Sequence, residues 1–176
     1  SLVVLHLLRE EINAAIYVDT GISFPENNAY IREICNEFGI NLITLKPERD
    51  FFDLVQKWGF PTIKTLWCRR WLKIEPLRMF FRKIKPPAWT YLGIRLAESP
   101  SRRKFYSKLP RGFQGIQRYD EKTGSWQFFP IAEWSDSQVW EYIRKHNLKI
   151  NPCYKLYGHA ACYFCPFLSN PKYYLR

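Results

Sequence analysis

The chain has 176 residues, of which 47% are hydrophobic and 18% aromatic, a composition typical of one globular domain with or without a small appendage. Lysine and arginine number 27 against 16 acidic residues, and this net charge of +11 favours polyanions or small phosphorylated ligands as partners, with a solvated basic surface as the alternative. No apolar run approaches the ~20 residues of a membrane span and no secretory leader is visible, so we expect a cytoplasmic protein with no membrane partner.

Helical and strand patterns alternate over the first part of the chain. A serine N-cap and a broad apolar face predict a helix over residues 1–11. Short apolar runs predict buried strands over 14–19 and 41–46. Between them, Pro25 opens a helical pattern that stops at Gly39. Strand, helix, strand is a right-handed crossover unit, so the pattern predicts an α/β fold with parallel strands.

The second part of the chain continues with the same two kinds of element. The predicted elements are helices over 50–58, 68–83 and 135–146 and strands over 88–94 and 127–131. Pro76 must kink or break the second of these helices. Ser135 and Gln138 have the spacing of a capping box at the start of the third. The stretch 107–125, rich in Gly, Arg and Lys, is the one candidate for a mobile flap.

Polar side chains follow the first and third predicted strands, at the sheet edge where open α/β sheets bind ligands. Asp19, Thr20 and Gly21 follow the first strand. The set that follows the third strand is Gly93, Arg95, Glu98, Ser99 and Arg102. Glycine allows close backbone approach, hydroxyls hold phosphate oxygens, and arginine forks bind phosphate or sulfate in pairs. These sets predict a nucleotide or anion site; the alternatives are a solvated arginine face and a carboxylate that only orients an arginine.

Four of the five cysteines predict a shared partner. Cys153, Cys162 and Cys165 form a C-x8-C-x2-C pattern, and Cys68 lies far upstream. Four thiolates can complete a tetrahedral Zn²⁺ site or hold an iron–sulfur cluster. The alternatives are two disulfides or buried cysteines acting as small hydrophobic residues, but without a secretory signal metal or redox use is favoured. Cys35 lies on an apolar helix face and is expected in the core.

Five motifs in the same order resemble the phosphoadenosine phosphosulfate reductases and their relatives in the adenine nucleotide alpha hydrolase superfamily. They are V-D-T-G-I-S-F-P-E (18–26), C-R-R-W-L-K-I-E-P-L (68–77), G-I-R-x-x-E-S-x-x-R (93–102), F-x-P-I-x-x-W (128–134) and N-P-C-Y ending in C-x-x-C-P (151–166). The resemblance implies a doubly wound, mainly parallel sheet in a nucleotide-binding domain over 1–148, with the cysteine-rich segment 149–176 packed on it. It also implies an adenosine nucleotide across the strand ends, bound by the polar residues above together with Ser1 and Phe24.

Two features of that family are missing from these residues. Members normally begin with a strand and an S-G-G-x-D-S loop that wraps the phosphates, and here only Ser1 could be the last residue of such a loop. We therefore expect weak nucleotide affinity for this chain. Thiol-based reductases of the family also carry an E-C-G-x-H tail, and these residues end at Arg176 without one. The cysteine spacing is most similar to that of relatives that insert sulfur into DNA, which hold a [4Fe-4S] cluster.

The resemblance implies an enzyme of sulfur metabolism that reduces phosphoadenosine phosphosulfate or adenosine phosphosulfate beside a four-cysteine centre. Arg95 and Arg102 would stabilise charge on the sulfonyl and phosphate oxygens, and Lys73 would contact the anion or tune the cluster. A thiol reductant such as thioredoxin would be a partner. The first alternative is ATP-dependent sulfur insertion into DNA or tRNA, which the basic charge favours. The second is a zinc-stabilised nucleic-acid-binding module whose cysteines are purely structural.

Overall fold

The computed structural model describes residues 2–84, 88–112, 115–159 and 162–167. The chain forms two compact units. Unit 1 comprises Ser1–Ile12 with Phe81–Lys149, and unit 2 comprises Asn13–Phe80 with Ile150–Arg176. Ser1, the predicted N-cap and ligand residue, lies outside the described residues. The domain boundary implied between residues 148 and 149 stays a prediction.

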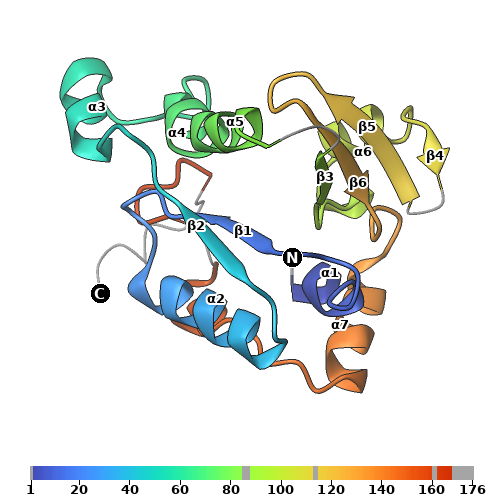
Figure 1. The fold of residues 1–176 in the computed structure, drawn as a ribbon. Coiled ribbons are helices and arrows are strands. Elements are labelled where there is room, and N and C mark those ends of the chain that lie inside the picture. The colour runs from blue at the N-terminus through green and yellow to red at the C-terminus, as the bar shows by residue number, and fades with distance from the viewer. Residues whose placement is uncertain (1, 85–87, 113–114, 160–161, 168–176) are drawn as a thin grey trace. The chain divides into compact units, whose positions relative to one another are not determined.

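Unit 2 contains the predicted crossover (Figure 1). Strand β1 (Ala15–Val18) pairs in parallel with β2 (Leu42–Leu45) along the whole length of both strands. Helix α2 (Pro25–Glu37) connects them, starting on a proline and ending just before Gly39, whose φ of +66° lies in the left-handed region. Cys35 is 1% exposed on the buried side of α2 and is a core residue, as predicted.

The remaining helices of unit 2 include those predicted over 50–58 and 68–83, with one irregularity, and a short helix over 153–157 that was not predicted. They are α3 (Phe51–Trp58), α4 (Trp67–Arg69), the π-helical segment η1 (Arg70–Ile74), α5 (Glu75–Arg82) and α8 (Cys153–Tyr157). Asp50 caps α3 by accepting a hydrogen bond from the backbone N–H of Phe52 at 2.7 Å. Pro76 breaks no helix; instead, the turn before it widens, because a proline has no N–H to continue the α-helical bonds.

Unit 1 is built on a mixed sheet whose strands run in the order β3, β6, β5, β4. β3 (Ala88–Tyr91) and β6 (Ser125–Phe129) are parallel and correspond to the two predicted strands. β5 (Gly115–Asp120) runs antiparallel to β6 and to the short β4 (Arg111–Gly112). About half of the described part of the stretch 107–125 is therefore strand, and the prediction that it is a mobile flap stays a prediction.

β5 was hard to recognise as a strand because its polar residues bond to one another within the sheet. Arg118 donates to the Gln127 side chain at 2.9 Å, and Gln127 donates to Asp120 at 3.1 Å. On the same face, the neighbouring cross-strand pair Ile116 and Phe129 is 1% and 0% exposed and belongs to an apolar core cluster. Paired polar groups can sit in a sheet at little net cost, so a polar pattern does not exclude a strand.

The helices of unit 1 complete this fold. They are α1 (Leu2–Leu7), the 3₁₀ segment η2 (Leu96–Glu98), α6 (Pro100–Tyr106) and α7 (Asp136–Lys145). The predicted capping box is confirmed, because Ser135 and Gln138 bond reciprocally at the start of α7. α1 and α7 share an apolar cluster, and His6 of α1 lies 2.9 Å from the Tyr142 hydroxyl of α7. None of the helices in the described ranges combines the length and apolarity that crossing a membrane requires.

Candidate nucleotide and thiol site

The loop after β1 forms a compact turn that directs backbone groups outward. The Asp19 carboxylate accepts a hydrogen bond from the backbone N–H of Gly21 at 3.1 Å. Gly21 has φ of +79°, and a Cβ built on it would meet no atom within 4 Å, so the requirement for glycine here is conformational rather than steric. Thr20 is 3% exposed, and its hydroxyl packs inward. Asp19 and Gly21 are thus the accessible members of the predicted set in unit 2.

The cysteine-rich segment pairs directly with this loop. Ser23 and Cys162 form an antiparallel β-bridge, and the N–H of Tyr163 donates to the Ile22 carbonyl at 3.0 Å. The Cys162 sulfur lies 3.5 Å from the hydroxyl of Thr20. Two motifs that are more than 130 positions apart in the sequence therefore form one structure.

Phe24 fixes the other end of the loop by ring contacts. Its ring stacks on Tyr157 with centroids 4.0 Å apart and meets the edge of Tyr163 at 4.4 Å. Only 5% of Phe24 is exposed. A nucleotide role for Phe24 stays a prediction, and the contacts present support the position of the loop.

Three of the four predicted metal ligands influence one another. Cys68 and Cys162 pack against the same apolar cluster of unit 2. Burial raises the pKa of the Cys68 thiol, and the charges of Cys162 and Cys165 raise it further, whereas a backbone hydrogen bond and Lys73 lower it. Lys73 is an exposed residue of η1, five positions after Cys68, and its positive charge favours the Cys68 thiolate.

Cys153 has a different environment from the other three. It is 0% exposed, and burial followed by the charge of Glu26 raises the pKa of its thiol. Tyr157 donates to one carboxylate oxygen of Glu26 at 3.0 Å, and within the described residues the other oxygen is buried without a hydrogen-bond partner. No three Cys, His, Asp or Glu side chains in the described ranges gather closely enough to hold a metal ion.

A chain of buried amides links Cys153 to the loop after β1. The Asn151 side chain accepts from the Cys153 N–H at 2.9 Å and donates to the Asn27 carbonyl oxygen at 2.7 Å. Asn27 donates to the Tyr17 hydroxyl at 3.2 Å. From there the chain runs on through Asn28, which accepts from Tyr17 and donates to Asp19. Both Asn27 and Asn151 are 7% exposed, so these bonds replace water.

The predicted anion-binding residues lie in unit 1, and carboxylates already bind both arginines. Arg95 is 14% exposed and lies 2.6 Å from the Asp136 carboxylate and 3.7 Å from that of Glu98. Arg102 forms an ion pair with the other oxygen of Glu98. Ser99 caps α6 by accepting from the backbone N–H of Arg102 at 3.2 Å. Glu98 therefore orients both guanidinium groups, and any anion must add to these pairs or displace them.

Gly93 of the same predicted set lies in the loop that follows β3.

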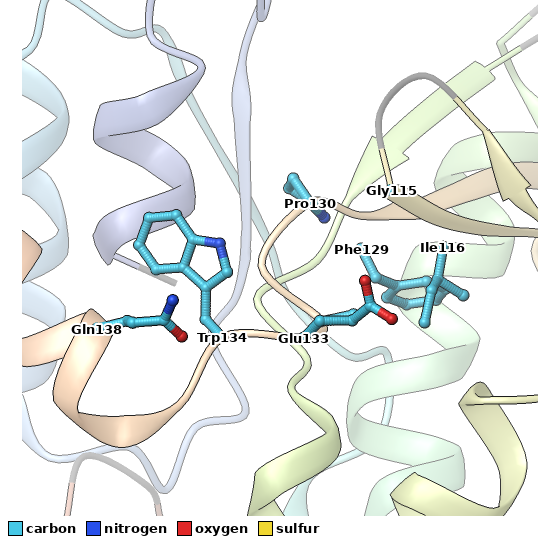
Figure 2. A pocket seen from close by; sticks show the side chains of 8 residues that line it. Gly115, Ile116, Phe129, Pro130, Glu133, Trp134 and Gln138 are labelled. Carbon is cyan, nitrogen blue, oxygen red and sulfur yellow. The ribbon is translucent and has the colours of Figure 1, made fainter.

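Unit 1 also contains a separate pocket of about 230 Å³ (Figure 2). Its lining includes Phe129, Glu133, Trp134 and Gln138, and none of the predicted site residues. Gln138 is held by the capping box, and Glu133 accepts from Arg111 at 2.8 Å, so its polar groups have structural partners.

Comparison with known proteins decides the family. The model of the phosphoadenosine phosphosulfate reductase domain matches residues 1–166. The chain belongs to the phosphoadenosine phosphosulfate reductase domain family. It is 30% identical over 159 residues to the protein MJ0973 of Methanocaldococcus jannaschii, covering 90% of this chain and 36% of that protein. It is 27% identical over 166 residues to the phosphoadenosine 5'-phosphosulfate reductase of Xylella fastidiosa, covering 88% and 63%.

A crystal structure shares the fold. The phosphoadenylyl-sulfate reductase of Candida auris, solved as a phosphate complex, superposes with a TM-score of 0.61 at 20% identity over 92% of this chain and 74% of that one. This confirms the predicted α/β class, with the parallel pairs β1–β2 and β3–β6. The chain spans 36% of the archaeal relative and 63% of the bacterial one.

The family motifs contain functional candidates that spacing alone missed. Glu26 ends V-D-T-G-I-S-F-P-E, and Asn151 begins N-P-C-Y. Glu26 has a buried carboxylate oxygen, and Asn151 begins the chain of buried amides. Residue type and spacing alone indicate a functional role for neither. Asp136, the strongest partner of Arg95, looked like a first-turn helix residue.

Proposed function

We propose that this chain is the nucleotide-binding part of a reductase-like enzyme of sulfur metabolism, which takes an adenosine sulfonucleotide. The observation that carries the proposal is the pairing of Cys162 with Ser23, which joins the two most specific family motifs into one structure. The family match over residues 1–166 supports the same substrate class. Asp19 and the turn at Gly21 offer a carboxylate acceptor and backbone groups, which suit the hydroxyl and amino groups of a nucleoside.

The proposed reaction is attack on the sulfur of the sulfonucleotide by the thiolate of an E-C-G-x-H segment of the family's type, which residues 1–176 do not contain; of the five cysteines present, four are proposed metal ligands and Cys35 is buried. A sulfur–sulfur bond forms, the bond from sulfur to the bridging phosphate oxygen breaks, and the adenosine phosphate leaves with the electron pair. Arg95 and Arg102 would bind sulfonyl and phosphate oxygens, exchanging present carboxylate partners for ligand oxygens. A dithiol reductant such as thioredoxin would then cleave the new sulfur–sulfur bond, which releases sulfite, restores the thiol and leaves the reductant as a disulfide.

We also propose that Cys68, Cys153, Cys162 and Cys165 hold a [4Fe-4S] cluster or, as the alternative, Zn²⁺. Four thiols are a suitable donor set for either, and the three that act on one another's charge fit it best. Because no three of these side chains gather closely enough within the described ranges, the thiols would have to move together to bind the group. A bound group would supply positive charge and a rigid tie between the segments that carry these thiols.

Nucleotide binding is the direct test. Titration calorimetry with adenosine 3',5'-bisphosphate would compare the wild type with Asp19→Asn. We expect the substitution to weaken binding about 10- to 150-fold, since one charge-assisted hydrogen bond is worth ~1.5–3 kcal/mol. Asp53→Asn, an exposed aspartate of α3, is the matched control and should change nothing. Adding a strand and an S-G-G-x-D-S loop at the N-terminus should raise the affinity. If neither version binds at millimolar nucleotide, the proposal is wrong.

The thiol centre needs its own measurement. Anaerobic purification followed by an absorption spectrum and metal analysis would compare the wild type with Cys165→Ser. Cys35→Ser is the control, because that cysteine is buried in α2. Absorbance near ~400 nm with iron and sulfide, lost only in Cys165→Ser, supports a cluster. Stoichiometric zinc without colour supports a structural site, and no metal in any preparation contradicts the metal proposal.

A further inference from the structure

Unit 2 exposes a group of large aromatic rings around helix α3. We call it the α3 surface and define it by Phe52, Trp58, Phe60 and Phe164, which are 52%, 41%, 56% and 37% exposed. Large rings left in water are unusual on a soluble protein when they are contiguous, and such patches commonly mark interaction sites. Phe52, Trp58 and Phe60 belong to no part of the site described above, whereas Phe164 lies between Cys162 and Cys165 of the candidate thiol site.

The rings are contiguous and held in place from below. Phe51 is 1% exposed and contacts Phe52, Phe60 and Phe164, with centroid distances of 5.3, 6.3 and 5.4 Å. Its contact with Phe164 is a parallel stack. Trp58 lies 6.0 Å from the ring of Trp71, so the aromatic surface continues toward η1. A ligand therefore meets preformed ring faces and loses little freedom of the protein on binding.

Cations accompany these rings. Arg49 lies 4.2 Å and Arg70 4.9 Å from the centre of the Trp71 ring, and Lys57 lies 5.7 Å from that of Trp58. The segment 46–73 holds seven lysine and arginine residues against three acidic ones. Within the described ranges, none of the seven forms a salt bridge with a carboxylate. The surface thus combines exposed aromatic rings with basic side chains that form no salt bridge within the described ranges, in a segment that also carries Glu48, Asp50 and Asp53.

We propose that the α3 surface binds a single-stranded polynucleotide. Bases stack on aromatic rings at about 1–3 kcal/mol per base, and cations beside the rings pair with the phosphates between the bases. A duplex hides its base faces and would use only the cations, and an acidic peptide has no flat rings to stack. Ring faces and phosphate contacts do not depend on the sugar, so the surface should bind DNA and RNA strands alike. This inference does not rest on the proposed reductase function.

Fluorescence anisotropy with labelled oligo(dT) and oligo(U) tests the proposal. The strands should have about 15 nucleotides, a length that spans one typical site. We expect both strands to bind within about threefold of each other and a matched duplex to bind more weakly. Affinity should fall with salt, by a slope of about −0.7 for each phosphate neutralised. Asp19→Asn should leave this binding unchanged, which separates it from a failure of the nucleotide site.

Two ring variants and one matched control make the test specific to this surface. Trp58→Ala and Phe60→Ala should each weaken binding about 5- to 100-fold, the range expected for one lost stacking contact. Trp89→Ala removes an equally exposed ring, 58%, from β3 in unit 1 and should change binding by less than about twofold. Arg70→Ala should lower the salt slope by about one phosphate without changing the preference for single strands.

Several results would overturn the proposal. Equal loss in Trp89→Ala and Trp58→Ala would mean that the rings of the α3 surface have no special role. Tighter binding of the duplex, or displacement of oligo(dT) by polyglutamate at equal charge, would mean that only the positive charge binds and that an acidic protein is the better partner. Circular dichroism of each variant guards against unfolding as the cause.

Discussion

Replacing Asn151 with alanine tests whether the buried amide chain holds unit 2 together. The Asn151 side chain makes two bonds, from the Cys153 N–H at 2.9 Å and to the Asn27 oxygen at 2.7 Å. Alanine can make neither. Because Cys153 is 0% and Asn27 7% exposed, water cannot readily take over, and two buried polar groups lose their partners.

The expected loss follows from those two groups. Each buried polar group left unsatisfied costs about 1–3 kcal/mol, so Asn151→Ala should lower the stability of unit 2 by about 2–6 kcal/mol. Asn27→Ala should cost a similar amount. The double variant should lose less than the sum of the two, with a coupling of about 1 kcal/mol, because both single variants break the same 2.7 Å bond.

Hydrogen exchange read by mass spectrometry suits this prediction, since it reports on each unit separately. A loss of 3 kcal/mol corresponds to about 150-fold faster exchange through opening. We expect this in peptides covering β1 and α8, with peptides of β6 in unit 1 unchanged. Asn36→Ala is the control, because Asn36 is an exposed residue of α2 and alanine favours helix there. A change below about 0.5 kcal/mol for Asn151→Ala would show that the amide chain does not stabilise unit 2.

Three further predictions address single features. Asp50→Ala removes the N-cap of α3 and should cost about 1 kcal/mol, measured as a lower urea midpoint. Gly115→Ala should destabilise unit 1 by several kcal/mol, since the φ of Gly115 is +92° and the new Cβ would lie 2.8 Å from the Phe129 carbonyl oxygen. Gly21→Ala should cost only about 1–2 kcal/mol, because its new Cβ meets no atom and only the backbone conformation is strained. Equal shifts of the melting temperature in the two variants would contradict this. Burial and then the charges of Arg9 and His146 lower the pKa of His6 in the folded state. The unfolded chain therefore binds a proton at His6 more readily, and unit 1 should lose stability as the pH falls below 6.5. Melting curves from pH 7 to 5 measure this trend, which His6→Gln should weaken.

Much of the fold was predictable because the signals are local. The apolar runs before Asp19 and around Ile43 mark parallel strands whatever lies elsewhere in the chain. The caps at Asp50 and Ser135 depend on bonds that span only two or three residues. Such patterns act within one turn, so a single sequence contains all the information they need.

The parts that escaped prediction depend on long-range partners. β5 looked like a polar loop because the partners of Arg118 and Asp120 come from the neighbouring strand. Asn151 and Asn27 are 124 positions apart, and nothing in either neighbourhood indicates the other. The cysteine spacing predicts one shared site for four thiols, but it cannot show that Cys153 lies against Glu26.

The arrangement in unit 2 makes the thiols and the nucleotide loop parts of one system. Cys162 is tied to Ser23 by a β-bridge, and Cys153 is tied to Asp19 through the amide chain. A change at these thiols that shifts either segment must therefore also shift the loop or break these bonds. Coupling of this kind is reciprocal. If a bound nucleotide stabilises one arrangement of the thiols by a given free energy, that arrangement strengthens nucleotide binding by the same free energy. On the proposed function, oxidation of the cysteines would then change nucleotide affinity without any thiol touching the nucleotide.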